Sequence, residues 1–131
     1  MNFQINILLG SDVPIYRQIV EQVKHAVAIA ALKEGEPLPS IRSLANRLVV
    51  NHNTVAKAYN LLVAEGIARS EKGRGLFIAT PRNLYSKEEL RRRFNESADR
   101  FVGDVLMLGF KKSEIVEAIQ SRLADVAILK D

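Results

Sequence analysis

The stretch Leu38–Ala45 reads LPSIRSLA, and the stretch Val50–Val55 that follows it reads VNHNTV. In the first, Ser40 is suited to cap a helix, because its hydroxyl accepts a hydrogen bond from an early backbone N–H. In the second, Asn51 is suited to cap another helix, which ends at Gly66, a residue that favours the left-handed conformation past a helix end. Two short helices joined by a tight turn, the second beginning with small polar side chains, predict a helix-turn-helix.

A β-hairpin is predicted directly after the second of these helices. Short apolar runs at residues 67–70 and 76–78 flank a glycine-rich basic stretch, Glu71–Gly75. Two such runs around a glycine-rich tip are typical of a hairpin. A further helix is predicted upstream, beginning at Pro14 and carrying an apolar stripe at helical spacing as far as Ala30. Three helices followed by a hairpin predict a winged helix-turn-helix fold, mainly α with a small β-hairpin wing.

The two ends of this predicted domain differ from its middle. Residues 3–7 alternate apolar and polar side chains, which predicts a short strand or an extended arm. The sequence Thr-Pro-Arg-Asn at residues 80–83 interrupts the helical and hairpin pattern. The chain is therefore expected to divide into a winged helix-turn-helix domain at residues 1–80 and a helical tail at residues 81–131.

The tail is predicted to form two amphipathic helices. Ser86, with Glu89 three residues later, forms a capping box for a long helix, and Ser113 is suited to cap a shorter one. Two helices of this length cannot enclose a core of their own, so they must pack on another surface. The long helix is expected to pair with its copy in a second chain through one apolar face, made of Leu90, Phe94, Phe101, Val105 and Leu108.

The composition restricts the class of protein. The chain has 131 residues, of which 47% are hydrophobic and 26% charged, as in folded soluble proteins. It contains no cysteine, no signal-peptide pattern and no apolar run near the roughly 20 residues of a membrane span, so a cytoplasmic protein with no membrane partner is expected. The net charge is +4, and residues 1–80 carry nine Lys and Arg against six Asp and Glu, which suits a polyanionic partner.

The predicted helix-turn-helix offers candidate contacts to double-stranded DNA. Arg42 lies two residues after the predicted cap of its helix, where a base or phosphate contact is favoured over a surface ion pair. Capping needs only one polar side chain, yet four stand at the start of the next helix. One or more of these four is expected to contact phosphates or base edges: Asn51, His52, Asn53 and Thr54.

The hairpin tip offers further candidates. Gly73 and Gly75 are what a tight turn needs, while Arg74 between them is placed to enter a minor groove and Lys72 to contact a phosphate. The basic run Arg91–Arg93 stands among glutamates on an amphipathic helix, so a solvated face with ion pairs is the better interpretation there.

The sequence gives little support for catalysis. Glu21 and His25 lie one helical turn apart, but a metal site needs at least a third ligand. The segment Gly73–Gly75 lacks the strand-to-helix context of a phosphate-binding loop, and no nucleophile, histidine and acid stand out as a set. The protein is expected to have no enzymatic activity and no cofactor.

These motifs resemble the DNA-binding domain of the GntR family of bacterial transcription regulators. The resemblance covers residues 12–79 and includes Pro14-Ile15-Tyr16, the two stretches quoted above and Gly73-x-Gly75-x-Phe77. The short two-helix tail is similar to that of the YtrA subfamily, in which it serves for dimerisation. The resemblance implies binding to an inverted-repeat operator as a homodimer, most often as a repressor. It assigns DNA contacts to Arg42, to Asn51–Thr54 and to the wing, residues 73–75.

Two positions depart from the family pattern. Many relatives carry an arginine where this chain has Ala56, so a DNA contact is missing there. Lys57 is the candidate to replace it, although the next residue of a helix points about 100° away. Ala30-Ala31 stands where a glycine is common, and this change is expected to lengthen the first helix.

The sequence therefore predicts a sequence-specific DNA-binding transcriptional regulator. Two alternatives remain open: a winged helix used for protein contact, which a gel shift would distinguish, and a small metal-dependent enzyme using Glu21 and His25, which metal analysis would test.

Overall fold

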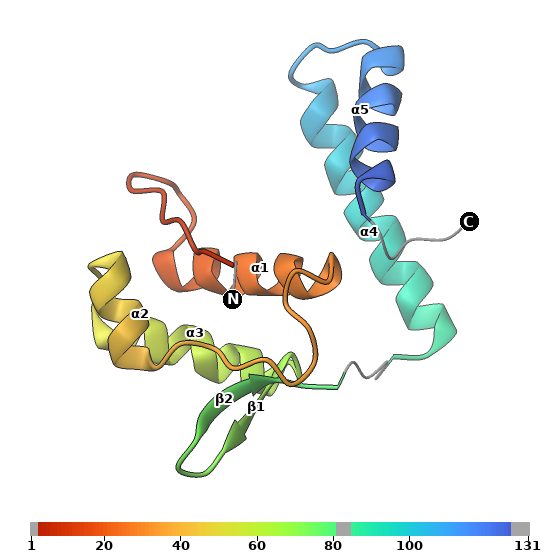
Figure 1. The fold of residues 1–131 in the computed structure, drawn as a ribbon. Helices are drawn as coiled ribbons and strands as arrows, with labels where there is room; N and C mark the ends of the chain where they lie inside the picture. Colours follow the sequence, from red (N-terminus) through yellow and green to blue (C-terminus); the bar gives the residue numbers. More distant parts are fainter. Residues whose placement is uncertain (1–2, 81–84, 127–131) are drawn as a thin grey trace. The chain divides into compact units, whose positions relative to one another are not determined.

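The computed structural model describes residues 3–80 and 85–126, and the chain divides into two compact units, residues 1–82 and 83–131. Unit 1 contains α1 (Ile15–Ala28), α2 (Ile41–Leu48), α3 (His52–Ala64), β1 (Ala68–Glu71) and β2 (Gly75–Ile78). Unit 2 contains α4 (Lys87–Leu106) and α5 (Lys112–Ala124) (Figure 1). The expected fold, mainly helical with a hairpin after the third helix, is confirmed.

Unit 1 has a continuous hydrophobic core. Apolar faces of α1, α2 and α3 meet there, and the hairpin closes it with Ala68 and Ile78. As expected of an amphipathic stripe, the buried residues of α1 recur at helical spacing. The buried residues of the unit are Ile19, Val20, Val23, Ala26, Leu32, Leu38, Leu44, Ala45, Val55, Ala58, Tyr59, Leu62, Ala68 and Ile78.

The three helices of unit 1 end in the same way, with a residue in the left-handed conformation. Gly66 follows α3 with φ 76°, and the N–H of Ile67 closes back on Leu62 O at 2.9 Å. Val49 follows α2 with φ 57°, and the N–H of Val50 bonds Ala45 O at 3.0 Å. The predicted role of Gly66 is thus confirmed, while a β-branched residue occupies the equivalent place after α2.

The end of α1 corrects one expectation. Ala30-Ala31 does not lengthen this helix, which ends at Ala28, because Ala30 adopts φ 60° and the N–H of Ala31 bonds Ala26 O at 2.8 Å. The turn brings the next side chain, Leu32, into the core with only 1% of its surface exposed. The burial of Leu32 thus offsets the conformational cost of the left-handed alanine at position 30.

Residues 3–8 form an extended arm rather than a strand of a sheet. Two glutamines of α1, one turn apart, hold its backbone. Gln22 accepts from the N–H of Asn6 at 3.0 Å and donates to its carbonyl at 2.7 Å. Gln18 does the same at Leu8, at 2.8 and 3.2 Å. The apolar side chains of the arm pack on the core: Phe3, Ile5 and Ile7.

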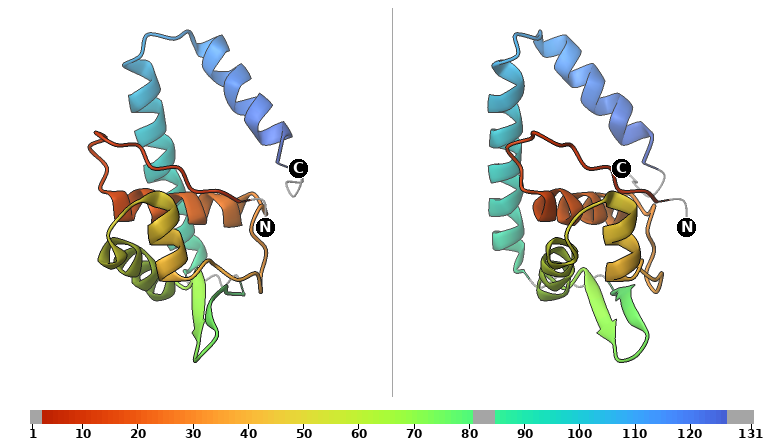
Figure 2. Two further views of the ribbon diagram at one scale, coloured as in Figure 1. Left: turned by 60° about the vertical axis from the view of Figure 1, so that its left-hand side comes forward. Right: turned by 90° about the vertical axis from the view of Figure 1, so that its left-hand side faces the viewer.

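The hairpin pairs Ala68 with Ile78 and Glu71 with Gly75 in antiparallel register. Residues 35–38 run along its other edge: Leu38 N–H bonds Leu76 O, and Ile78 N–H bonds Glu36 O, both at 2.9 Å. This edge pairing fixes the hairpin to the loop that leads into α2. In both Figure 1 and Figure 2 the hairpin projects beyond the helices of unit 1.

Unit 2 consists of α4 and α5, which separate from each other as they leave their connecting turn (Figure 2). Ser86 caps α4 as predicted, accepting from Glu89 N–H at 3.1 Å. Two boundaries differ from expectation. The helix ends at Leu106, so Leu108 lies in the turn beyond it, and α5 is preceded by Lys111, which leaves Ser113 inside the helix. Lys111 N–H bonds the Glu114 carboxylate at 3.2 Å and needs no serine cap.

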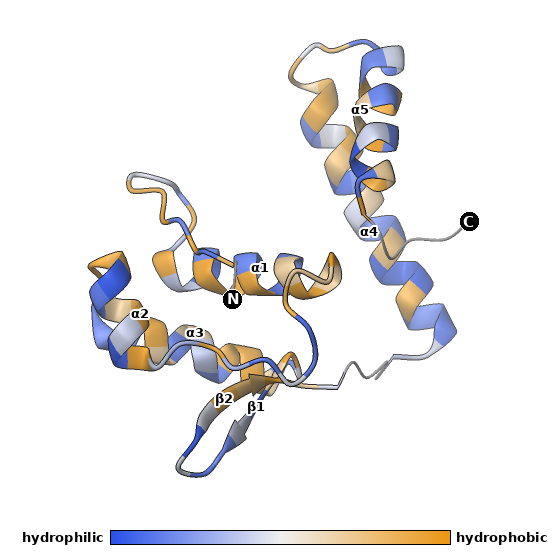
Figure 3. Ribbon diagram, viewed as in Figure 1, coloured by the Kyte–Doolittle hydropathy of each residue, from blue (hydrophilic) through white to orange (hydrophobic). Residues whose placement is uncertain are grey.

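Neither α4 nor α5 buries a residue. Figure 3 shows the start of α4 as mostly hydrophilic and the part near the turn to α5 as more hydrophobic. Several large apolar side chains near that turn are more than half exposed: Leu106, Met107, Leu108 and Phe110. No helix within residues 3–80 and 85–126 is long and apolar enough to cross a membrane.

Candidate nucleic-acid interface

The N-terminus of α3 is capped and exposed. The side-chain oxygen of Asn51 accepts from the backbone N–H of Asn53 at 2.7 Å, which confirms the predicted cap. His52 and Asn53 are exposed, Thr54 is half-buried, and none of the three side chains forms a hydrogen bond within the described residues. Capping therefore occupies one polar group of the four and leaves hydrogen-bonding groups at the helix start available to a ligand.

Arg42 occupies the first turn of α2 and is exposed. Ser40 caps this helix as predicted, accepting from Ser43 N–H at 3.0 Å. The preceding residue is attached to α3, because the Tyr59 hydroxyl donates to Pro39 O at 2.7 Å. Burial raises the pKa of this hydroxyl, which stays a neutral donor. Tyr59 thus fixes the start of α2, and with it the place of Arg42, against the body of α3.

Lys57 is placed toward α1 instead of at the tip of α3. Its ammonium lies 4.0 Å from the centroid of the Tyr16 ring, and the Arg17 guanidinium lies 5.5 Å from the same centroid. Such a cation–π contact at an exposed site contributes about 0.5–1 kcal/mol and favours a position of the ammonium over the ring. Its role as a substitute for the missing arginine contact at Ala56 stays a prediction.

The tip of the hairpin, Lys72–Arg74, is exposed. Gly73 has φ 77° and Gly75 has φ 100°, so both glycines are required by the turn itself. The Arg74 side chain is 71% exposed, and its guanidinium pairs with the Glu71 carboxylate at 3.1 Å. The sequence analysis does not predict a role for Glu71, because its pairing with Arg74, three residues away, depends on the conformation of the turn between them.

The apolar residues predicted for dimerisation separate into two places on unit 2. Phe101, Val105 and Leu108 line an open groove of about 420 Å³ between α4 and α5. Leu90 and Phe94 line a second, more open hollow with Lys87 and Arg91. The far wall of the groove is not predicted from the sequence. It is formed by Phe110, which precedes α5, and by Ile115, Ala118 and Ile119 of that helix, and Glu114 and Arg122 also line the groove.

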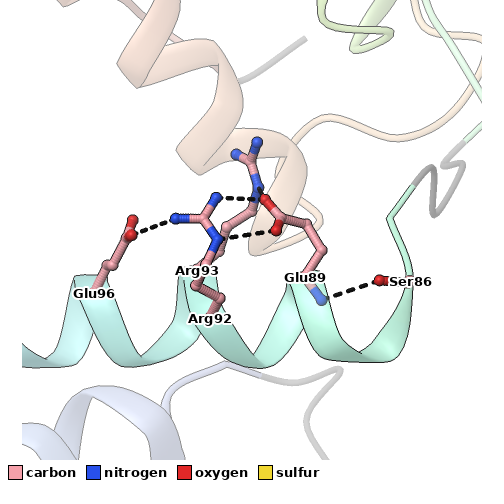
Figure 4. Close-up of polar contacts among 5 residues, drawn as sticks. All are labelled: Ser86, Glu89, Arg92, Arg93 and Glu96. Carbon is pink, nitrogen blue, oxygen red and sulfur yellow. Dashed lines mark hydrogen bonds and ion pairs between the residues drawn. The ribbon is translucent and has the colours of Figure 1, made fainter.

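The basic run of α4 forms the ion-paired surface that the sequence predicts. Glu89 pairs with Arg92 at 2.5 Å and with Arg93 at 3.0 Å, and Arg92 also pairs with Glu96 (Figure 4). The hydrogen bond from Arg92 and the contacts from Arg93 lower the pKa of the Glu89 carboxyl to about 2, although the side chain lies at the surface. Its carboxylate is thus used on these arginines, and only the Ser86 half of the expected capping box forms.

The alternative metal site gains no support from the described part of the chain. No group of three His, Cys, Asp or Glu side chains that could hold a metal occurs there. The Glu21 carboxylate is instead 3.9 Å from Arg17.

A three-helix core with a capped, exposed α3 and a hairpin wing defines a winged-helix DNA-binding domain. Residues 15–78 match the family described as bacterial regulatory proteins, gntR family. The transcriptional repressor YtrA of Bacillus subtilis (strain 168) is 34% identical over 116 residues, which is 88% of this chain and 89% of that protein. The chain belongs to the GntR family and is a DNA-binding transcriptional regulator.

Solved structures agree with this assignment. A crystal structure described as a transcriptional antiterminator from Listeria monocytogenes EGD-e matches with a TM-score of 0.75 and 32% identity over the whole of both chains. YtrA from Sulfolobus acidocaldarius, a GntR-family transcription factor, matches with a TM-score of 0.59 and 40% identity over 72% of this chain and 97% of that one.

Proposed function

We propose that this regulator is a cytoplasmic repressor that binds an inverted-repeat operator as a homodimer. The observation that carries the proposal is the state of unit 2: α4 and α5 bury no residue, and an apolar groove lies open between them. Exposed apolar surface of this kind is unfavourable in water unless another surface covers it. A second copy of the same two helices supplies a covering surface of matching character.

Two-fold pairing of this kind fits the task of the winged domain. A dimer with two-fold symmetry sets two copies of α3 in successive major grooves, about 34 Å apart, and so selects a near-palindromic site. The relationship to the repressor YtrA supports repression as the outcome. The candidate DNA contacts are those of the α2 and α3 starts and of the hairpin tip: Arg42, Asn51, His52, Asn53, Thr54, Lys72 and Arg74.

Sedimentation of the full chain tests the dimer. We expect Phe101→Asp, in the groove, to convert a dimer to a monomer, since it would place a charge in an apolar interface. Leu9→Asp is the matched control, because Leu9 lies in unit 1 and is 83% exposed. Truncation after Thr80 should leave a folded monomer. A truncated protein that sediments as a dimer, or a full chain that is monomeric on its operator, would rule out this role of unit 2.

Selection of bound sequences from a random duplex pool tests the operator, and an inverted repeat is the expected result. Arg42→Ala should then weaken operator binding by about 1–3 kcal/mol with little change in the thermal midpoint. Arg100→Ala on α4 removes the same charge outside unit 1 and serves as the control. Equal affinity of the Arg42→Ala variant and the wild type would remove Arg42 from the interface.

A further inference from the structure

The outer face of the hairpin carries a cluster of charged and aromatic side chains. In the register of the two strands, Arg69 lies opposite Phe77 and Glu71 opposite Gly75. Because side chains alternate along a strand, these residues lie on the face opposite Ala68 and Ile78, which are buried in the core. Gly75 has no side chain, so the space across from Glu71 is left to its ionic partners.

One carboxylate in this cluster serves two arginines. Glu71 lies 3.3 Å from the Arg69 guanidinium and 3.1 Å from that of Arg74. Both guanidinium groups also lie over the Phe77 ring, at 5.7 and 5.3 Å from its centroid. Two positive charges share one negative charge, and the cluster keeps a net charge of +1.

The two arginines are not equally held. Arg69 stands within β1 and also donates to Ile78 O at 2.8 Å, so it is fixed by the strand pair. Arg74 stands in the exposed turn, and its side chain is 71% exposed against 44% for Arg69. Its polar contact among the described residues is Glu71. Arg74 is therefore the arginine that can exchange its partner.

We propose that Glu71 is an internal competitor of DNA for Arg74 and thereby sets the background affinity of the wing. Carboxylate oxygens and the acceptor oxygens of DNA compete for the N–H groups of a guanidinium. Glu71 lies 3.1 Å from one nitrogen of Arg74, so contact of that nitrogen with DNA is made at the expense of this ion pair. The released carboxylate then stands next to the DNA backbone, where like charges repel. This penalty falls on every DNA sequence alike, so net binding depends more on the contacts made at α3. The inference rests on the proposed contact between Arg74 and DNA.

The test compares full-length wild type with Glu71→Gln on a short duplex of scrambled sequence. Glutamine keeps the size of the side chain and removes its charge. We expect binding to be about two- to fivefold tighter, the effect of one exposed ion pair. We also expect the slope of log affinity against log salt to be steeper by up to about one. Glu65→Gln is the control, since Glu65 has similar exposure and pairs with Lys24 at 3.6 Å away from the wing.

Arg74→Ala in both backgrounds separates this inference from the proposed function. It should weaken binding more in the Glu71→Gln protein than in the wild type, because the arginine there is available to DNA from the start. If Arg74→Ala leaves binding unchanged in both backgrounds, the wing contact and the competitor role are both wrong. If Arg74→Ala weakens binding but Glu71→Gln does not strengthen it, the wing contact stands and the competitor role of Glu71 is wrong.

Discussion

The two units of the chain are built from the same kind of amphipathic helix, yet only one of them encloses its apolar face. In unit 1 three helices and a hairpin surround a core in which Ile19, Val55 and Leu62 are fully buried. In unit 2 two helices stand apart and bury no residue. Amphipathic spacing thus fixes which face of a helix is apolar, while the number of elements around that face decides whether one chain can bury it.

The largest expected effect distinguishes burial of a side chain within one chain, as in unit 1, from burial between two chains, as proposed for unit 2. Leu62→Ala, in the core of unit 1, should lower the free energy of unfolding by about 2–5 kcal/mol at any protein concentration. Val105→Ala, in the groove of unit 2, should instead lower a melting temperature that itself rises with protein concentration. Thermal melts over a range of concentrations check both. A Val105→Ala effect independent of concentration would mean that unit 2 buries its groove within one chain.

Val49 and Gly66 hold equivalent left-handed positions after α2 and α3. Since a left-handed conformation costs a side-chain-bearing residue about 1–2 kcal/mol, Gly66→Ala should destabilise unit 1 by about 1 kcal/mol. A Cβ at Gly66 meets no atom within 4 Å, so backbone conformation alone is measured.

Val49→Gly should give the opposite sign and raise the free energy of unfolding by about 1 kcal/mol. Val49 is 89% exposed, so little packing is lost with its side chain. Chemical denaturation of the two variants gives both values. A destabilised Val49→Gly protein would show that the valine side chain makes a contribution that outweighs its backbone strain.

A smaller effect is expected from Tyr59→Phe. This change removes the hydrogen bond to Pro39 O and should lower the free energy of unfolding by about 0.5–1.5 kcal/mol. Operator affinity should fall as well, because Arg42 follows this attachment point. If stability falls and operator affinity does not, the start of α2 is positioned by Ser40 and the core without help from the hydroxyl.

The smallest effect is expected on the charged surface of α4. The pKa of Glu89 is lowered from 4.5 to about 2, so its ion pairs favour the folded state above pH 4.5 and are lost as the pH falls through about 2. Between these values the wild-type thermal midpoint should fall slightly more than that of Glu89→Gln. The two proteins should differ little at neutral pH, because the network is exposed to solvent. Parallel melts across this pH range measure the difference.

Local signals in the sequence predicted much of unit 1. Ser40, Asn51 and Gly66 act through backbone groups two to five residues away, and all three were placed correctly. The left-handed conformations of Ala30 and Val49 cannot be predicted in this way, because neither residue type indicates one. At Ala30 the burial of Leu32 decides the turn, which is a tertiary effect.

The candidate site was predictable in its residue types but less so in its contacts. The pairing of Lys57 with Tyr16 joins two helices and does not follow from spacing along the chain. Glu71 and Arg74 are only three residues apart, but their pairing depends on the conformation of the turn between them. In unit 2 the apolar stripe of α4 can be predicted from the sequence. The residues of α5 that face this stripe cannot, because their position depends on the path of the turn between the two helices.

The glutamine contacts of the N-terminal arm have a consequence for how the protein leaves DNA. Gln18 and Gln22 hold the backbone of Leu8 and Asn6 through uncharged amide groups, which do not titrate and which ions do not screen. A rise in ionic strength weakens phosphate contacts steeply. Dissociation by salt should therefore release a winged domain whose arm is still attached, ready to rebind without refolding its first residues.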